Sequence, residues 1–271
     1  MCERNFIADE AKCIHCGLCV KDCIEYAIEL DENKIPKMTK PEMCINCQHC
    51  FAICPTGAIS INGKKVENSQ KIKKQNPDDI LNLIKSRRSD RQYKNENLSA
   101  EKLAKLKDML KWVPTGCNYH KLKFSFIDDV EVMNDYRNKV NTALKKVLAE
   151  NEELAGKFGS FKDVLFRGED LIFRGAPHLL VVSNDKNAPC SNEDGVIALS
   201  YFEMYAQSMG LGTCWCGFMK TILQIFPEFC QYLEIPDDYD FCYAILFGEK
   251  AVNYQRTTQP EEVIIKSVSK K

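Results

Sequence analysis

Two copies of one cysteine motif lie close together near the start of the chain. Each copy reads C-x2-C-x2-C-x3-C, and corresponding cysteines of the two copies are 31 residues apart. The charged N-terminus predicts a cytoplasmic chain, in which thiols stay reduced, so this density of cysteine favours metal binding over disulfides. The eight cysteines of the two motifs are Cys13, Cys16, Cys19, Cys23, Cys44, Cys47, Cys50 and Cys54.

The spacing within each motif is typical of cysteines that bind [4Fe–4S] clusters. Three thiolates in a tight loop can bind three corners of a cubane, and the fourth, on the following helical turn, reaches the other cluster. Zinc also binds C-x2-C pairs, but a four-ligand zinc site leaves the triplet followed by C-x3-C unexplained. The sequence therefore predicts two clusters with crossed ligands. The first set is Cys13, Cys16, Cys19 and Cys54, and the second is Cys44, Cys47, Cys50 and Cys23.

Residues 4–61 resemble a bacterial two-cluster ferredoxin. The resemblance rests on the two motifs, on Gly17 inside the first, and on the run Cys54-Pro55-Thr56-Gly57-Ala58-Ile59 at the end of the second. One departure is Ile24, which stands where such ferredoxins place proline, and we expect a tuned or looser site there rather than a missing cluster. The implied ferredoxin domain covers residues 1–63.

Charge and composition limit the partners of the whole chain. The 271 residues carry a formal net charge of −1, which creates no field that attracts nucleic acid or an anionic membrane. No apolar run approaches the roughly 18 residues of a membrane span. Residues 64–76 carry five lysines and one glutamate, a composition that predicts a solvated basic linker.

From residue 77 onward the hydrophobic pattern alternates between helical and strand periods. Helices are expected from Pro77, after an Asn76 cap, and from Ser99. Residues 133–147 and 196–209 have further helical spacing, while 122–126, 179–182 and 241–247 read as strands. The pattern predicts an α+β layer fold with a central sheet covered by helices. We expect residues 150–175 to be irregular and residues 210–217 to form a glycine-rich loop.

Two short motifs in this second part have features of a binding site. Arg87-Arg88-Ser89-Asp90-Arg91 brings three guanidinium groups and a hydroxyl together, which suits a phosphate, although a basic run alone is more often a solvated helix end. Pro114-Thr115-Gly116-Cys117-Asn118 is a loop of mostly small residues between a helix and a strand. No Rossmann or Walker loop is visible, because the glycines at 210–217 follow a helix and lack the required spacing.

Together these motifs resemble the FMN-dependent nitroreductase family over roughly residues 77–265. The matching segments are R-R-S-x-R at 87–91, P-T-G-x-N at 114–118, the A-P strand entry at 176–182, G-L-G-T-x-W at 210–215 and the final strand at 241–248. The resemblance implies a nitroreductase-like three-layer domain over residues 77–271, with a C-terminal arm, after the ferredoxin-like domain.

The resemblance also implies FMN as a cofactor, bound at the interface of a homodimer. It places Arg87, Ser89 and Arg88 at the FMN phosphate, and Arg91 near N1 and O2 of the ring. Cys216 and Gly217 are implied to lie near N5 and O4. The family's C-terminal basic residue is missing at Thr258 and Gln259, so Arg256 is the nearest substitute. The loop residues expected from the partner subunit are Pro114, Thr115, Gly116 and Asn118.

The combined reading is a flavin-dependent oxidoreductase. The clusters are expected to pass single electrons to FMN, which reduces a small acceptor such as a nitroaromatic, a quinone or an activated alkene. The expected donor is a low-potential ferredoxin, or NAD(P)H. Two alternatives stay open: an electron-transfer module or redox sensor that serves a partner protein, and a reductive dehalogenase or flavin-fragmenting relative. No catalytic side chain is identified, and His120 and His178 are expected to be hydrogen-bonded structural residues.

Overall fold

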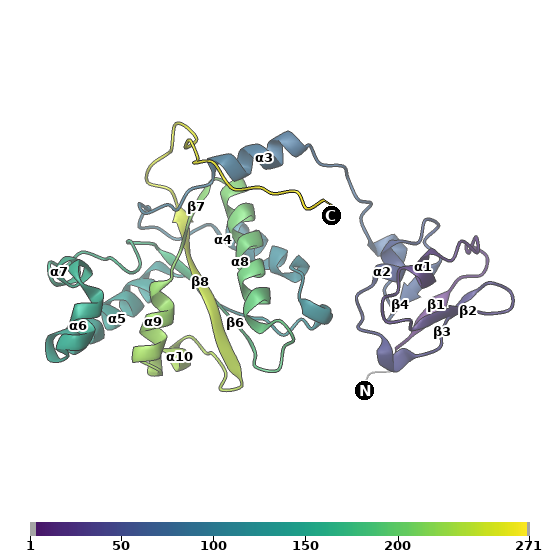
Figure 1. Ribbon diagram of the computed structural model, residues 1–271, viewed down its shortest axis with the longest axis horizontal. Helices are drawn as coiled ribbons and strands as arrows, with labels where there is room; N and C mark the ends of the chain where they lie inside the picture. Colours follow the sequence, from purple (N-terminus) through teal and green to yellow (C-terminus); the bar gives the residue numbers. More distant parts are fainter. Residues whose placement is uncertain (1–3, 270–271) are drawn as a thin grey trace. The chain divides into compact units, whose positions relative to one another are not determined.

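The computed structural model describes residues 4–269 (Figure 1). The chain divides into two compact units. Unit 1 extends to Gln75 and includes the short segment Cys117–Tyr119, and unit 2 comprises Asn76–Gly116 and the chain from His120 onward.

Unit 1 repeats its backbone as well as its cysteines. Strand β1 (Phe6–Ala8) pairs with β4 (Ile59–Ile61), and β2 (Ile28–Leu30) pairs with β3 (Pro36–Met38), all antiparallel. A short helix contains the third cysteine of each triplet, α1 (Leu18–Lys21) with Cys19 and α2 (His49–Ala52) with Cys50. Left-handed residues recur 31 positions apart, at His15 and Asn46, Gly17 and Gln48, and Tyr26 and Gly57. The same turn is therefore built twice, as the sequence repeat predicts.

Unit 2 is built on an antiparallel four-stranded sheet in the order β5-β6-β8-β7. The strands are β5 (Lys123–Ile127), β6 (His178–Asp185), β7 (Leu211–Trp215) and β8 (Tyr239–Glu249). Strand β5 forms one edge of the sheet, and β6 and β8 lie in its centre. Seven of the eight residues of β6 are buried, which requires cover on both faces of the sheet.

Helices supply that cover on both faces (Figure 1). Leu179 and Val181 of β6 pack with one helix group, whereas the alternating Leu180 and Val182 pack with the other. The first group contains α5 (Val130–Glu150), α9 (Phe218–Ile225) and α10 (Glu228–Tyr232), and the second contains α4 (Ala100–Met109) and α8 (Ser191–Ser208). The predicted three-layer α+β fold is confirmed.

The expected helix starts at residues 77 and 100 are also confirmed. The Asn76 side chain accepts a hydrogen bond from the N–H of Asp78 and caps α3 (Pro77–Ser86). The Ser99 side chain caps α4 by accepting a hydrogen bond from the N–H of Lys102. Both caps satisfy donors that a helix N-terminus leaves free.

Two expectations about irregular segments were wrong. Residues 150–175 contain α6 (Glu152–Phe158) and α7 (Ser160–Phe166), separated by Gly159 with a φ of 51°. Most of the expected loop 210–217 is strand β7, because residues 211–215 pair with β8 along their whole length. Beyond β8, residues 251–269 form no helix or strand. No helix within residues 4–269 is both long and apolar enough to cross a membrane.

Candidate functional site

Each predicted set of four cysteines in unit 1 lines a cavity of its own. One cavity is bordered by Gly17 and by the thiols of the first triplet together with Cys54, the last cysteine of the second motif. The other is bordered by Gln48 and by the second triplet together with Cys23, the last cysteine of the first motif. The crossed grouping expected for two clusters is therefore the grouping that the fold brings together.

The environment of Cys54 suits a thiolate ligand. Its Sγ accepts a hydrogen bond from the N–H of Ala58 at 3.2 Å and lies 3.7 Å from the Thr56 hydroxyl. Burial raises the pKa of the Cys54 thiol, but these hydrogen bonds outweigh it and hold the pKa below its ordinary value. Burial instead raises the pKa of Cys19, and it raises the pKa of Cys50 to about 12, so the grouping of the cysteines and not their pKa values indicates the ligands.

The arginine-rich segment 87–91 is extended and attached to the sheet. Ser89 forms a parallel bridge to Thr213 of β7, and the N–H of Asp90 donates to the Thr213 carbonyl at 2.8 Å. The Asp90 side chain is buried, whereas Ser89 is half-buried and Arg91 is exposed. Successive side chains of an extended segment point to opposite sides, so the inward Asp90 directs its neighbours outward.

Two of the three arginines have features of an anion site. Arg87 Nη1 lies 3.3 Å from Oε1 of Glu203, a carboxylate of α8 whose exposed fraction is 6%. The Nη2 atom of Arg88 is buried and has no hydrogen-bond partner among residues 4–269. A buried guanidinium donor without a partner is costly, and a phosphate oxygen is a fitting acceptor for it. These residues fit the phosphate end of an FMN molecule.

A cluster of polar side chains behind this segment was not predicted from the sequence. Asp90, Gln207 of α8, Thr213 of β7 and Lys250 share hydrogen bonds and one ion pair in the interior. Its sequence signal is the pair of polar residues Glu203 and Gln207, four positions apart in the mostly apolar second half of the helix. Residues with that spacing lie on one face of a helix, here the face toward the sheet.

The predicted loop 114–118 is held at one end by α8. The N–H of Gly116 donates to Oδ1 of Asp194 at 2.8 Å, and a Cβ on Gly116 would lie 2.8 Å from Sγ of Cys190. Thr115 Oγ1 accepts a hydrogen bond from the N–H of His120. Cys117 and Asn118 both have left-handed backbone conformations, which makes a tight, defined turn.

At the end of β7, the geometry separates the two residues predicted for the flavin ring. The N–H of Cys216 donates to the carbonyl of Ala244, so this N–H already has an acceptor within the protein. Burial raises the pKa of Cys216 to about 12, which keeps this thiol neutral. A Cβ on Gly217 would lie 2.9 Å from the Tyr243 hydroxyl, so a larger residue there would have to displace the Tyr243 side chain.

The remaining predicted residues have different surroundings. His178 is fully buried, its Nε2 accepts a hydrogen bond from the N–H of Leu98, and burial lowers its pKa to about 4. The expectation of a structural histidine is confirmed there. His120 instead is exposed and borders a surface groove. Arg256 is exposed in the segment after β8 that forms no helix or strand.

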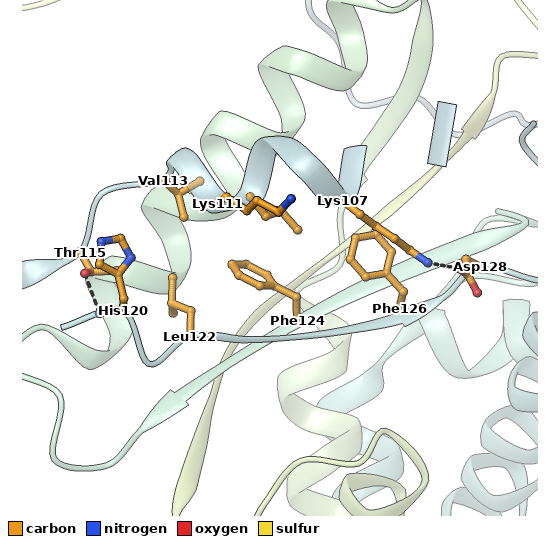
Figure 2. A pocket seen from close by; sticks show the side chains of 10 residues that line it. Lys107, Lys111, Val113, Thr115, His120, Leu122, Phe124, Phe126 and Asp128 are labelled. Atoms are coloured by element: carbon orange, nitrogen blue, oxygen red, sulfur yellow. Dashed lines mark hydrogen bonds and ion pairs between the residues drawn. The ribbon is translucent and has the colours of Figure 1, made fainter. Parts of the chain in front are cut away.

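That groove runs along the free edge of the sheet (Figure 2). It has a volume of about 560 Å³, and its apolar floor is formed by the side chains of Phe124 and Phe126 of β5 and of Leu122, which directly precedes the strand. Its rim is charged: Lys107 forms an ion pair with Asp128, and Lys111 lies further along. An edge strand with apolar side chains beside it favours pairing with another segment.

Comparisons with known proteins match both units. A family model described as "Nitroreductase family" matches residues 84–249, and one described as "4Fe-4S dicluster domain" matches residues 12–58. A nitroreductase with bound FMN from Desulfitobacterium hafniense aligns with a TM-score of 0.58 at 24% identity, over 72% of this chain and 100% of that one. A nitroreductase with bound FMN from Bacteroides fragilis gives a TM-score of 0.57 at 21% identity, over 71% of this chain and 100% of the other.

Each of two curated relatives matches less than half of this chain. An iodotyrosine deiodinase from Thermotoga neapolitana is 27% identical over 135 residues, which is 49% of this chain and 71% of that protein. An archaeal-type glutamate synthase [NADPH] from Thermotoga maritima is 43% identical over 53 residues, 20% of this chain. The chain spans only about a tenth of the length of that glutamate synthase.

Proposed function

The chain belongs to the nitroreductase family, and we propose that it is an FMN-dependent oxidoreductase supplied with single electrons through two [4Fe–4S] clusters. The proposed substrate is a small organic acceptor such as a nitroaromatic, a quinone or an activated alkene. The observation that carries the proposal is the pair of cavities in unit 1, each bordered by four cysteines, on the same chain as the family's fold.

When bound, the clusters supply one-electron transfer and FMN supplies the coupling of single electrons to a two-electron reduction. The protein's own residues bind and orient these groups. Arg87 and Ser89 bind the FMN phosphate, Arg88 contributes its buried donor, and Arg91 opposes negative charge near N1 and O2 of the ring. The neutral thiol of Cys216, next to Gly217 in the chain, is buried and donates to the carbonyl of Ile172.

The iron–sulfur unit favours a one-electron donor over direct use of NAD(P)H. A nicotinamide that transfers hydride directly to a flavin makes a fused iron–sulfur unit redundant. We therefore infer that the physiological donor is a low-potential ferredoxin and that the protein works in the cytoplasm, where such donors and reduced thiols are found.

The active form is proposed to be a homodimer. The exposed side chains of Ile197, Tyr201 and Tyr205 lie along α8 at a spacing that places them on one helix face, which is an apolar surface available to a second copy.

The segment after β8 exposes Val263, Ile264, Ile265 and Val268, by 74–99%. Two glutamates precede these residues, which complements the lysines on the rim of the β5 groove. A second copy's C-terminal segment is thus a fitting occupant of the groove.

The test is the rate of flavin reduction by a one-electron donor. Replacing Cys13 and Cys16 by Ala removes ligands of one cluster and leaves unit 2 unchanged. After anaerobic loading with FMN, rapid mixing with reduced ferredoxin should show slower flavin reduction than in the parent. Cys230→Ala, a half-buried thiol of α10 outside both sets, is the matched control. Parent-like flavin reduction in a variant confirmed to lack the cluster would contradict the proposed electron path.

A second candidate is reductive dehalogenation, in which two electrons and a proton replace a carbon–halogen bond by carbon–hydrogen and release halide. The similarity to an iodotyrosine deiodinase favours it, as does the pair of helices α6 and α7, which exposes Phe161 and Phe166. An anaerobic screen of the reduced enzyme against nitro, quinone, enone and halogenated compounds separates the candidates. Turnover of none of them would favour an electron-transfer module or sensor.

A further inference from the structure

The buried polar cluster behind segment 87–91 has an unusual composition for a protein interior. Asp90 has an exposed fraction of 1%, yet it is a carboxylate on a segment that otherwise carries arginines. Its Oδ2 accepts hydrogen bonds from Gln207 Nε2 at 2.8 Å and from the N–H of Thr213 at 3.1 Å. Its Oδ1 faces Lys250 Nζ at 3.8 Å. Desolvating such a group costs free energy, so it is a poor choice for stability alone.

Gln207 joins the members of this cluster to one another. Its Nε2 donates to Asp90, to the Thr213 hydroxyl at 3.0 Å and to the carbonyl of Arg88 at 3.2 Å. Its Oε1 accepts a hydrogen bond from Lys250 Nζ at 2.8 Å. One side chain of α8 therefore contacts the backbone of segment 87–91, strand β7 and the end of β8 at the same time.

The backbone leaves space for this arrangement at Gly212 of β7. A Cβ at Gly212 would lie 2.9 Å from Cβ of Asp90 and 3.2 Å from Cγ of Lys250. Glycine at this position thus lets both charged side chains approach the strand. Lys250 is also paired through its backbone, by an antiparallel bridge to Tyr93. The cluster connects segment 87–91 to the point where the C-terminal segment with Arg256 begins.

We propose that Asp90, Gln207 and Lys250 are positioning residues that fix the register of segment 87–91, so that Arg87, Ser89 and Arg91 face the FMN. The inference rests on the proposed FMN site. Asp90 is the inward side chain of an extended run, and a slip by one residue would turn Ser89 and Arg91 inward. Directional hydrogen bonds prevent that slip, whereas an apolar side chain fills the space in several registers.

The experiment compares FMN with riboflavin, which lacks the phosphate. Binding of each to deflavinated full-length protein is measured by quenching of flavin fluorescence, and the ratio of the two dissociation constants reports phosphate recognition. Asp90→Ala should reduce the preference for FMN about tenfold, or about 1.4 kcal/mol. Asp90→Asn keeps an oxygen that accepts from Gln207 and Thr213, so it should retain most of the preference.

Two further variants separate positioning from stability. Asp90→Ala removes the carboxylate that faces the partly buried Lys250 ammonium, which then keeps only its hydrogen bond to Gln207. Adding Lys250→Met removes this unpaired charge and should therefore recover thermal stability. It should not recover the preference for FMN. If Asp90→Ala does not fold, Gln207→Leu tests the same cluster, and a similar loss of preference is expected.

The outcomes distinguish this inference from the proposal on which it rests. If the parent binds riboflavin as tightly as FMN, the phosphate site itself is wrong, and the positioning role is overturned with it. If the parent prefers FMN and Asp90→Ala or Gln207→Leu weakens both flavins equally, the cluster has only a structural role and the inference is wrong. An unchanged preference in the folded variants overturns it as well.

Discussion

At the scale of single residues, the strongest expectations concern charged groups whose partners are visible. Arg87 is half-buried and is paired with Glu203, which is almost fully buried. The ion pair uses a single N–H of the guanidinium, which leaves further donors for a phosphate oxygen. A phosphate dianion offers more acceptor oxygens than Glu203, so the arginine can bind both.

Replacing Arg87 by Ala should weaken FMN binding by roughly 1.5–3 kcal/mol, because a charge-assisted contact with a dianion is lost. The measurement is the FMN dissociation constant at fixed salt. Glu203 loses its ion pair in this variant and keeps only the hydrogen bond from the Thr213 hydroxyl, so Arg87→Ala combined with Glu203→Gln tests whether the effect comes from the phosphate contact. Arg167→Ala, an exposed arginine paired with exposed Glu169, is the control and should bind FMN like the parent. Equal affinity in Arg87→Ala would show that Arg87 is no phosphate ligand.

His178 makes the stability of unit 2 depend on pH. Burial lowers its pKa to about 4 in the folded protein, against about 6.5 in the unfolded chain. Below pH 6.5 the unfolded state binds a proton that the folded state does not bind. The contribution of the neutral His178 to the free energy of unfolding is therefore fully present above pH 6.5. Between pH 6.5 and pH 4 the free energy of unfolding falls by up to about 1.4 kcal/mol per pH unit.

The check is denaturant unfolding at pH 7, 6 and 5, followed by tryptophan fluorescence, because both tryptophans, Trp112 and Trp215, lie in unit 2. His178→Gln keeps an acceptor for the Leu98 N–H and cannot titrate. Its unfolding free energy should vary less between pH 7 and pH 5 than that of the parent. Identical slopes in the two proteins would rule out His178 as the group responsible.

At the scale of elements, local patterns predicted the helices and strands that have strong periodicity or a cap. Asn76 and Ser99 marked helix starts because capping is a local interaction between a side chain and the next turn. Strand β7 was missed because Leu-Gly-Thr-Cys-Trp has glycine inside it and gains its order only from pairing with β8. Helices α6 and α7 were missed because each has only seven residues, with a glycine between them.

The C-terminal segment allows a test of the homodimer at this scale. Replacing Ile264 and Ile265 by Asp should dissociate the dimer, because two apolar side chains that fit the β5 groove become charged. Ser267→Asp adds charge to the same exposed segment without removing an apolar group, so it should remain dimeric. Analytical ultracentrifugation of the three proteins gives the answer. A parent that sediments as a monomer would contradict the dimer, and an unchanged dimer in the double variant would remove the segment from its interface.

At the scale of the whole molecule, each cysteine set expected from the spacing borders one cavity, because the repeat fixes two equal turns. The left-handed residues at equivalent positions, such as Gly17 and Gln48, show the same turn formed twice. The polar cluster of Asp90, Gln207 and Lys250 could not be found in this way, because its members are up to 160 residues apart and meet only after the sheet has formed. Motif spacing reveals a site whose residues lie within one segment. It gives little indication of a site whose residues come from four separate segments of the chain.

The crossed grouping of cysteines makes a prediction about pairs of variants. Each chain should hold about eight irons and eight sulfides, with one FMN, when purified anaerobically. Cys54→Ala lies in the second motif but borders the cavity of the first triplet, so it should alter the same cluster as Cys13→Ala. Cys23→Ala should in turn alter the same cluster as Cys44→Ala.

Electron paramagnetic resonance of the reduced proteins, with iron analysis, identifies which cluster each variant loses. Under crossed ligation, the spectrum of Cys54→Ala matches that of Cys13→Ala and differs from that of Cys44→Ala. If each motif instead bound a cluster by itself, Cys54→Ala would match Cys44→Ala. Cys230→Ala should keep the full iron content, since that thiol borders neither cavity. If the parent contained zinc in place of iron, both arrangements would be wrong, because each of them is an arrangement of iron–sulfur cluster ligands. Zinc at these cysteines also cannot carry electrons to the flavin, so the proposed electron path would be wrong as well.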